Sequence, residues 1–510
     1  MPFALSHHLN PLLTDYLHYP SGANLMWNTS ILFPALVLTP VTDLFGPIVS
    51  YNVLAVLGMS LSGWCAFLAV RRYSRRWVSA AVGGLLYEFS PFLVVQINGH
   101  AQLFVAVFPP LLVLFADEIL VRQRHRAWLI GVLLGVAAAA QLLTGTELLA
   151  ISVLMAVPAL ITVAVIFRAR LRERMPYVIR AAGFAAAAFV VLAGYPLYII
   201  LLGPGRVSGA LQGTGFVARP TSFLLPSSFE LIGGRSTVLD SSVYIGVPLL
   251  ILAVAVTIRM RRHPVVVAAA VTVACAMVLA LGGNLTLHGV ATGIPLPWII
   301  PQSLPVLDNV LPVRLMVAGY LALAVIMAVF LDRVLEAPLR WRIAGLTAAL
   351  VALVPLIPTL PISSAQYMIP SFFTDGAASR LPTTGSVLMT PYGGGVPDYP
   401  PEVWQAVSGV DFRTQIGMVF TPGPGGFEWG PEKDALGQEL TAPGNGAAAP
   451  ASLSASQREA YLGDMRAHGV DAIVVGPSAG QDQEAQFLTE VTGQPGDSTG
   501  GVVVWFDVHP

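Results

Sequence analysis

The chain has 510 residues, of which 55% are hydrophobic and only 11% are charged, and its formal net charge is −1. A soluble domain usually carries about 25% charged residues, so this composition argues against a soluble protein and indicates that lipid surrounds most of the chain. A net charge near zero also argues against a nucleic-acid partner. Both cysteines, Cys65 and Cys275, fall in apolar segments, which favours buried thiols over a disulfide framework or a metal site.

The first 47 residues precede the first long apolar segment. Tyrosine and tryptophan side chains are spaced through residues 1–30, and these side chains favour the membrane–water interface. The apolar stretch 31–44 is shorter than the ~20 residues that a span requires, and prolines interrupt it. We therefore expect residues 1–47 to form an interfacial or re-entrant segment.

Apolar segments then follow one another with regular alternation, and we predict about ten membrane spans in residues 48–358. They lie near residues 48–70, 77–90, 101–120, 127–145, 147–166, 181–202, 243–258, 264–282, 314–331 and 343–358. Two loops between them are long, 203–242 and 283–313. Loops of this length without regular periodicity are more often functional than idle.

Every second linker in this region is rich in arginine. The first contains Arg71-Arg72-Tyr73-Ser74-Arg75-Arg76, and together the five linkers hold most of the chain's 27 lysine and arginine residues. They are 71–76, 121–126, 167–180, 259–263 and 332–342. Clustered arginine beside a span is retained in the cytoplasm. We therefore predict a multi-pass protein of the cytoplasmic membrane with these linkers inside and the alternate loops outside.

After residue 358 charges, glycines and prolines become frequent, and no further span is evident. Short strands are predicted at 387–391, 472–477 and 502–508, and helices at 456–468 and 481–491. Ser456 and Glu459 have the spacing of a capping box that opens the first of these helices. We expect residues 359–510 to form a small extracytoplasmic α/β domain, whereas the stretch 422–450 is too rich in Gly, Pro and Ala to assign.

Carboxylates near the predicted outer ends of the spans are the first candidates for chemistry, because acids in a membrane domain are costly and tend to be functional. Glu88 precedes Pro91, which interrupts the helix and either opens the acid to a cavity or lets it reach interfacial water. Glu147 acts chemically or favours the start of its span through the helix dipole. Asp15 is a further acid or a solvated turn residue.

Further polar side chains share the outer turns. A neutral imidazole at His100 could ligate a metal or contact a phosphate, or it is merely solvated. Arg314, at the mouth of a span, binds a phosphate through paired hydrogen bonds or extends to the interface. Gln141 lies in the same turn as Glu147. No phosphate-binding loop, nucleophile elbow or His/Cys metal spacing is present.

Several short motifs resemble, in their order and spacing, membrane glycosyltransferases of the actinobacterial GT-C type, and this resemblance covers most of the chain. The motifs are Tyr19-Pro20-Ser21-Gly22-Ala23-Asn24-Leu25-Met26-Trp27-Asn28, Gly46-Pro47, Tyr51-Asn52, Phe89-Ser90-Pro91, Gly99-His100, Gln141 with Glu147, Tyr244-Ile245-Gly246 and Leu311-Pro312-Val313-Arg314.

The resemblance implies an enzyme that takes a sugar from a polyprenyl-phosphate carrier and transfers it outside the membrane to a glycan, lipid or protein acceptor. An acid would deprotonate the acceptor hydroxyl, and a cation or a divalent metal would stabilise the departing phosphate. We expect the catalytic acids among Glu88, Glu147 and Asp15. The expected substrate-binding residues are His100, Gln141, Arg314, Tyr244 and Arg219.

The start of the chain departs from the family pattern. Such proteins usually carry a first span and then an acid-containing motif before the segment that matches Pro2-Phe3-Ala4-Leu5. We expect that an upstream helix is missing from this start site, which would also explain how residues 1–47 come to lie outside. Without that helix the usual acid is absent and Asp15 is a poor substitute, so the chain would be inactive or not a transferase.

Two other functions remain open. A transporter or flippase of a lipid-linked glycan would have internal repeats and interrupted helices that meet at the membrane midplane, and no convincing repeat is detected. A non-catalytic envelope protein, whose outer domain binds a partner, is favoured if the acids do not converge on one cavity.

Overall fold

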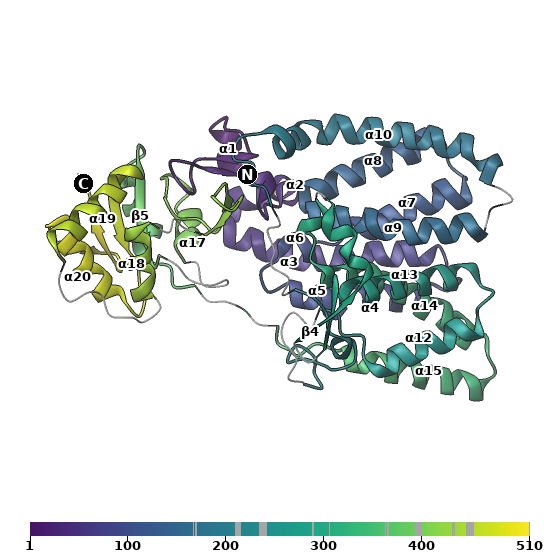
Figure 1. Ribbon diagram of the computed structural model, residues 1–510. Coiled ribbons are helices and arrows are strands. Elements are labelled where there is room, and N and C mark those ends of the chain that lie inside the picture. Colours follow the sequence, from purple (N-terminus) through teal and green to yellow (C-terminus); the bar gives the residue numbers. More distant parts are fainter. Residues whose placement is uncertain are drawn as a thin grey trace. The chain divides into compact units, whose positions relative to one another are not determined.

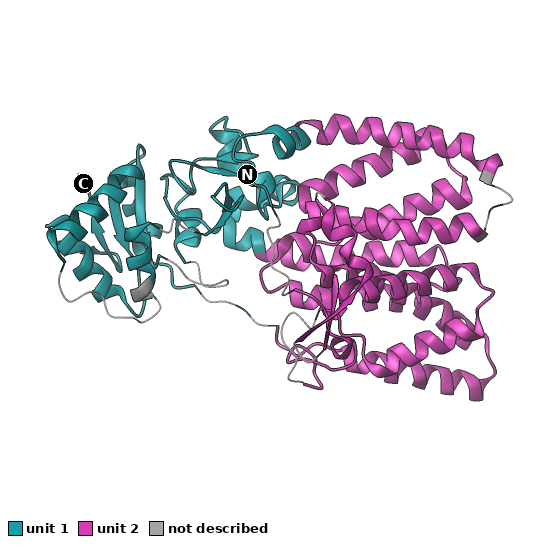
Figure 2. Ribbon diagram, viewed as in Figure 1, with its two compact units in different colours: residues 1–51, 196–209, 364–510 teal, residues 52–195, 210–363 magenta. Residues whose placement is uncertain are grey.

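The computed structural model describes residues 1–166, 168, 171–209, 216–233, 242–287, 290–304, 306–362, 364, 367–392, 400–430, 434–444, 453–508 and 510. The chain folds into two compact units (Figure 2). Unit 1 comprises residues 1–51, 196–209 and 364–510, and unit 2 comprises residues 52–195 and 210–363. Parts of both predicted outer loops and of the 167–180 linker lie outside the described residues.

Unit 2 is built from long helices (Figure 1). They are α3 (Thr39–Arg71), α4 (Trp77–Glu88), α7 (Phe108–Asp117), α8 (Ala127–Thr144), α9 (Thr146–Ile166), α10 (Leu171–Leu202), α12 (Val247–Arg259), α13 (Pro264–Ala280), α14 (Met316–Glu336) and α15 (Leu339–Leu353). The first residues of α3 and the last residues of α10 belong to unit 1. Between the long helices lie two short ones, α5 (Pro91–Gln96) and α6 (Ala101–Phe104), and the hairpin of β3 (Asn284–Leu287) and β4 (Val290–Pro295).

Helices occupy all ten positions at which spans were predicted. Eight stretches of the described chain are long and apolar enough to cross a membrane: Thr39–Arg71, Trp77–Gln96, Ala101–Arg122, Ala127–Thr144, Thr146–Val165, Arg172–Leu202, Pro312–Glu336 and Leu339–Leu356. The other two helices, α12 and α13, have 13 and 17 residues. The total of about ten spans therefore remains a prediction.

Two helix starts differ from the predicted spans. The helix α3 begins before residue 48, but Gly46 interrupts it with φ +82° and ψ 170°, a backbone conformation that glycine adopts easily. The helix α10 begins about ten residues before the predicted span, so Arg172, Arg174 and Arg180 lie in the helix instead of the linker. Arginine is a good helix former, and the helix continues past its apolar part.

Close packing between α8 and α10 depends on two glycines spaced four residues apart. A side chain at Gly131 would collide with the backbone oxygen of Ala181, and one at Gly135 would collide with that of Ala185. Small residues at this spacing let two membrane helices approach closely. The most buried of the long apolar helices is α14, in which 89% of an apolar 18-residue stretch is buried.

The arginine-rich linkers meet at one end of unit 2. Arg72 pairs with the buried Glu118 at 3.1 Å, and Arg122 pairs with Asp117 at 2.6 Å. Both acids come from the end of α7 and the π-helical turn η2 (Glu118–Arg122) that follows it. Arg174, near the start of α10, donates to the Leu120 carbonyl oxygen at 3.1 Å. Three linkers, 71–76, 121–126 and 167–180, are thereby joined.

The remaining two linkers reach the same end. Asp332 accepts hydrogen bonds from the Ser74 hydroxyl at 3.1 Å and from the backbone N–H groups of Arg75 and Arg76 at 2.6 and 3.2 Å. Burial, followed by the charges of Arg333 and Arg75, lowers the pKa of His263, which places the 259–263 linker beside them. Direct contacts thus join four of the five linkers, and the effect of Arg333 and Arg75 on His263 places the fifth near them, whereas the cytoplasmic location of this end stays a prediction.

Unit 1 contains a four-stranded sheet in the order β5-β8-β10-β9. Its strands are β5 (Ser386–Thr390), β8 (Val470–Val475), β9 (Asp497–Thr499) and β10 (Val502–Trp505). β5 runs parallel to β8 with Leu388 opposite Ile473, and β10 is antiparallel to both β8 and β9. The remaining helices are α16 (Ser371–Thr374), α17 (Pro400–Val407), α18 (Ala435–Gly444), α19 (Ala455–Ala467) and α20 (Gln481–Thr492).

The sequence predicted the three main strands and both C-terminal helices of this unit, but it chose the wrong cap for one helix. The capping box of α19 is formed by Ser454 and Gln457, which exchange hydrogen bonds with each other's backbone. The predicted partner Glu459 instead pairs with Arg466 at 2.5 Å. Both pairs have the same spacing, and the serine two residues earlier takes the cap.

The N-terminal residues fold together with the C-terminal part of the chain in unit 1. They form α1 (Pro2–Ser6), the paired strands β1 (Leu13–Thr14) and β2 (Ala23–Asn24), and α2 (Leu32–Val37). Thr414 donates its backbone N–H to the Tyr16 carbonyl oxygen at 3.1 Å, and Asn28 accepts from the Phe420 backbone N–H at 2.7 Å. Phe420 opens a second small hairpin, β6 (Phe420–Thr421) with β7 (Glu428–Trp429).

Candidate functional site

A part-buried ion pair forms the centre of the candidate site in unit 2. Glu147 lies in the first turn of α9, where the helix dipole favours a carboxylate. Its Oε1 accepts from the Leu311 backbone N–H at 3.0 Å, and its Oε2 accepts from Arg314. The two side chains are only 14% and 12% exposed. Because the pair is part-buried, loss of one partner costs less than the ~3–5 kcal/mol typical of a fully buried pair.

The segment before α14 determines where the arginine lies. Pro312 begins a short 3₁₀ turn, η8 (Pro312–Leu315), which leads directly into α14. Proline is well suited to the first position of a helical turn. The turn places Arg314 at the start of a buried helix, beside the beginning of α9.

His100 lies close enough to the pair for charges to interact. It directly precedes α6 and is partly buried. Burial, and then the charge of Arg314, lower the pKa of His100 to about 4. The imidazole is therefore neutral at physiological pH, so it offers one N–H donor and one acceptor nitrogen without adding a positive charge.

Gln141 holds the turn that leads to Glu147. It is fully buried, and its Nε2 donates to the Gly145 carbonyl oxygen at 3.0 Å. A side chain at Gly145 would come within 2.7 Å of the Gln102 carbonyl oxygen, so this turn requires glycine. Gln141 was predicted to bind substrate, and the contacts that it makes position the turn. Its Oε1 is buried without a hydrogen-bond partner among the described residues.

Glu88 lies at the end of α4 and packs over Gly63 of α3, whose missing side chain leaves room for the carboxylate. The helix ends there as predicted, and Ser90 and Pro91 begin α5. Among the described residues, no hydrogen bond or ion pair joins Glu88 to the Glu147–Arg314 pair.

Tyr244 and Arg219 lie in the connections around α12. Tyr244 is buried, and its carbonyl oxygen accepts from the hydroxyl of Tyr320 in α14. The side chain of Arg219 is exposed, while its backbone N–H donates to the Ser222 hydroxyl at 3.1 Å. Neither residue has a described polar contact with Glu147 or Arg314.

Asp15 belongs to unit 1, unlike the other predicted site residues. It pairs with Arg413 at 3.0 Å, and its side chain is 50% exposed. The guanidinium of Arg413 also lies over the ring of Tyr16, 5.0 Å from its centroid. Nothing in the local sequence around Arg413 indicates an acidic partner, so this pair could not be predicted.

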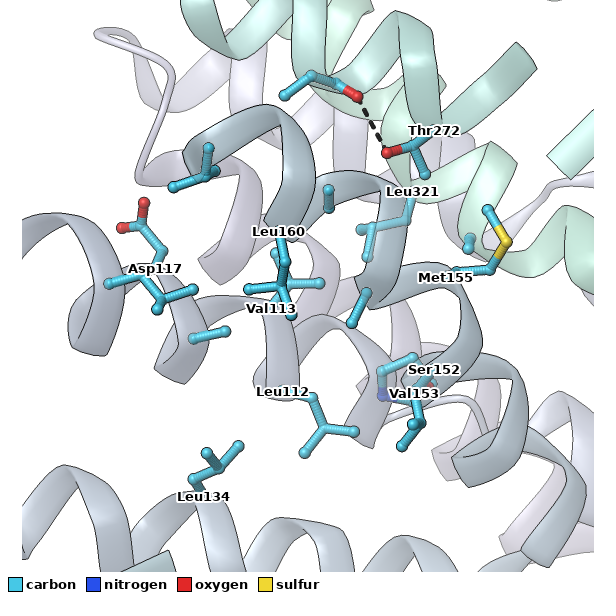
Figure 3. Close-up of a pocket in the computed structure, with 18 of the residues that line it drawn as sticks. Leu112, Val113, Asp117, Leu134, Ser152, Val153, Met155, Leu160, Thr272 and Leu321 are labelled. Carbon is cyan, nitrogen blue, oxygen red and sulfur yellow. Dashed lines mark hydrogen bonds between the residues drawn. The ribbon is translucent and has the colours of Figure 1, made fainter. Parts of the chain in front are cut away.

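An apolar cavity of about 870 Å³ lies between α7, α8, α9, α10, α13 and α14 of unit 2 (Figure 3). Leu112, Met155 and Leu321 contribute to its wall, and Asp117 and Arg124 lie near its arginine-rich end. Its lining begins at Leu149 and Val317, within one turn of Glu147 and Arg314. The stretch from Leu149 to Val163 rises about 21 Å along α9 at ~1.5 Å per residue.

Sequence reasoning missed this cavity, although small residues that keep it open recur in several helices. They include Gly135, Ala138, Ala156, Ala159, Ala185, Ala268, Ala318 and Ala322. Within the described part of the chain, no group of three or more His, Cys, Asp or Glu side chains is arranged to hold a metal ion.

Comparison of the sequence with protein-family models and with curated proteins finds no match. Among solved structures, the cryo-EM structure of the arabinofuranosyltransferase AftD from Mycobacteria is similar, with a TM-score of 0.57 and 15% identity. A mutant of the same protein gives a TM-score of 0.54 and 16% identity. The apo oligosaccharyltransferase of Archaeoglobus fulgidus has a TM-score of 0.46 and 13% identity over 93% of this chain and 64% of its own.

All of this chain is covered in the AftD comparisons, but only 37% and 39% of the AftD chains. The chain thus spans less than two fifths of the length of those proteins, and at this identity the likeness concerns the fold alone. Eight apolar helices and this architecture make the chain a multi-pass membrane protein. Its multi-span helical fold is similar to that of AftD and matches the GT-C-type membrane fold predicted from the sequence, while the number of spans and the extracytoplasmic side of the C-terminal part stay predictions.

Proposed function

We propose that the chain is a membrane glycosyltransferase that moves a sugar from a polyprenyl-phosphate donor to an acceptor outside the cytoplasmic membrane. One observation carries the proposal: Glu147 and Arg314 pair within one helical turn of a long apolar cavity, and the neutral His100, whose pKa is lowered by burial and then by the charge of Arg314, lies near that arginine. A lipid-linked sugar phosphate has the matching parts, an apolar chain for the cavity and a phosphate for the arginine.

Arg314 and Glu147 can take different roles in the transfer step. A guanidinium has five N–H donors, so Arg314 can bind the donor phosphate through a pair of them, including the one that now contacts Glu147. The phosphate then competes with Glu147 for the arginine and frees a carboxylate oxygen. In the transfer step the acceptor oxygen forms a bond to the anomeric carbon, and the bond from that carbon to the phosphate oxygen breaks.

The same arrangement accounts for the proton that the acceptor loses and for the charge that the phosphate gains. Glu147 takes the proton of the acceptor hydroxyl as general base, and the departing phosphate keeps the electron pair beside Arg314. His100, being neutral, can donate one further hydrogen bond to the phosphate. Glu88 remains a second candidate base, and we assign Asp15 no step.

Charge-reversal variants test this function. We expect Glu147→Gln to lower transfer roughly 10²–10⁴-fold, the usual contribution of a general base. Arg314→Gln should also lower transfer. The decisive variant is the double exchange Glu147→Arg with Arg314→Glu, which restores an ion pair but misplaces both groups. It should be more stable than either single charge reversal and remain inactive, whereas recovery of activity would mean that the pair is only structural.

The assay measures transfer of labelled sugar from synthetic polyprenyl-phosphate donors in membranes, beginning with arabinofuranose because AftD is named for that sugar. Glu459→Gln is the matched control, since this acid pairs with Arg466 on the surface of unit 1. An arm with EDTA tests the divalent metal predicted from the resemblance, and unchanged transfer there would remove the metal from the proposal. Full activity of Glu147→Gln and of Glu88→Gln would remove both acids from the reaction, and the absence of transfer by the parent chain would overturn the transferase assignment.

A second function, transport of a lipid-linked glycan between leaflets, is favoured by the length of the same cavity. Its lining extends from one turn beyond Glu147 to Arg124 at the arginine-rich end. Proteoliposomes with a fluorescent lipid-linked sugar separate the two functions. Movement of the label between leaflets without any transfer would favour the transporter.

A further inference from the structure

Unit 1 contains a separate cavity of about 700 Å³, which the proposed transfer step does not use. It lies among the β1–β2 hairpin, α2, residues 204–205 and α17, all of which belong to unit 1. Its volume falls within the range of roughly 300–1,000 Å³ that small-molecule sites occupy. Apolar side chains such as Leu9, Leu13 and Ile31 form much of its wall.

Polar groups from α17 enter this cavity at defined positions. Glu402 accepts from the Met418 backbone N–H at 2.6 Å through one oxygen, which leaves its second oxygen available as an acceptor. Burial raises the pKa of Glu402. Gln405 uses its two N–H groups on the carbonyl oxygens of Tyr16 and Phe412, both at 2.9 Å. Because both N–H groups of Gln405 are used, its amide can offer only its oxygen to a ligand.

Residues 15 and 16, beside Gln405, add an aromatic ring and a second carboxylate to the lining. The rings of Tyr16 and Phe3 meet edge to face, 4.7 Å apart. Asp15 pairs with Arg413, which also donates to the Thr383 carbonyl oxygen at 2.7 Å and covers the Tyr16 ring. These contacts hold Asp15 and Tyr16 in place before any ligand arrives, which lowers the entropic cost of binding.

The charges of the lining select the ligand class. The described side chains that line the cavity include the carboxylates Asp15, which pairs with Arg413, and Glu402, but no lysine, arginine or histidine; the amino group of Met1 also belongs to the lining. Carboxylates repel a phosphate or a uronic acid, whereas they accept hydrogen bonds from hydroxyl groups. A pyranose or furanose presents neighbouring hydroxyls together with an apolar C–H face, and the apolar wall with Leu9, Leu13 and Ile31, together with the part of the Tyr16 ring that Arg413 leaves uncovered, suits that face.

We infer that this cavity of unit 1 binds a neutral saccharide through Glu402, Gln405, Asp15 and Tyr16. That the saccharide is the acceptor glycan rests on the proposed function. Saccharide binding itself does not, because it requires neither the donor nor Glu147.

The test uses the full chain in detergent and a panel of neutral trisaccharides from arabinan, mannan and starch, with trigalacturonic acid as the anionic comparison. Binding is measured by saturation-transfer-difference NMR and by calorimetry. We expect at least one neutral trisaccharide to bind and the anionic one to bind about tenfold more weakly or not at all. Ala406→Phe should fill the cavity from α17 and abolish binding, whereas Ala460→Phe, on the exposed face of α19, should leave it unchanged.

Glu402→Gln provides the second variant, because an amide oxygen can still accept from Met418 while the other carboxylate oxygen is replaced by a donor. We expect its affinity to fall about tenfold with no loss of thermal stability. The inference is overturned if no neutral trisaccharide binds, if Ala406→Phe binds as tightly as the parent chain, or if native mass spectrometry finds a lipid in the cavity. Binding that persists in a chain without transfer activity would sustain this inference and defeat only the proposed function.

Discussion

Individual acids of this chain occupy very different environments, although their local sequences look alike. Glu147 is tied to Arg314 and to the backbone of Leu311, Glu88 packs over a glycine, and Glu402 has a single backbone donor. An acid that is buried with few partners destabilises the folded state when it ionises. Such acids tend to be kept where a ligand uses them.

The pH dependence of stability tests the environment of Glu402. Its pKa is raised in the folded chain, mainly by burial, so the folded state holds the proton more tightly than the unfolded state. Stability is therefore highest below the ordinary glutamate pKa and falls as pH rises from there through the raised value. Glu402→Gln cannot ionise, and we expect its unfolding temperature to match that of the parent chain near pH 4 and to exceed it near pH 8.

Thermal scans of the two chains across this pH range measure the difference. Glu459→Gln serves as the control, since this acid lies on the surface beside Arg466. A gap between parent and Glu402→Gln that does not change with pH would contradict the assigned environment.

How much of the site could be predicted depends on sequence distance. The order of the spans predicted that His100, Glu147 and Arg314 lie at the same end of unit 2. This prediction needs only the number of spans between them, because alternate loops lie at the same end. The order of the spans could not predict that Glu147 pairs with Arg314, 167 residues away, or that Asp15 pairs with Arg413, 398 residues away. Both cavities arise where several elements meet, so no single stretch of sequence contains their signal.

Helices of this chain differ in how well their ends could be predicted. Apolar length sets the middle of a span, but the ends depend on competition between nearby residues. In α19 two serines compete for the same role, and Ser454 takes it with Gln457 as its partner. In α10 the arginines that were expected in a linker extend the helix instead.

Two alanine variants test the cap of α19. We expect Ser454→Ala to cost about 1 kcal/mol, the usual effect of losing an N-cap hydroxyl, while Ser456→Ala should change stability by less than about 0.5 kcal/mol. Hydrogen exchange of the Gln457 amide gives a local measurement, because this amide donates to the Ser454 hydroxyl. Equal exchange in both variants would contradict the cap seen in the structure.

At the scale of the whole molecule, the arginine-rich linkers and the candidate site lie at different ends of the helices of unit 2. All five arginine-rich linkers meet at one end, and the turns that carry His100, Glu147 and Arg314 meet elsewhere, at the opposite ends of the same helices. This separation fits retention of arginine in the cytoplasm and a reaction on the other side.

Cysteine labelling tests which side each end faces. In a chain with Cys65→Ala and Cys275→Ala, we expect an impermeant maleimide to label Arg219→Cys on intact cells. Arg124→Cys should react only after the membrane is permeabilised, because Arg124 belongs to the arginine-rich end. Arg466→Cys on α19 should behave like Arg219→Cys if the C-terminal part is extracytoplasmic. The reverse pattern would invert the topology and move the candidate site into the cytoplasm.

The hydrogen bonds of Asp332 also bear on how the chain is made. This carboxylate holds a turn that precedes it by up to 258 residues. At a synthesis rate of roughly 5–20 residues per second, the turn waits about 13–50 s for its partner. During that interval the first helical hairpin is in the membrane without its hydrogen bonds to Asp332. We therefore expect membrane proteases to degrade nascent chains that are halted before residue 332.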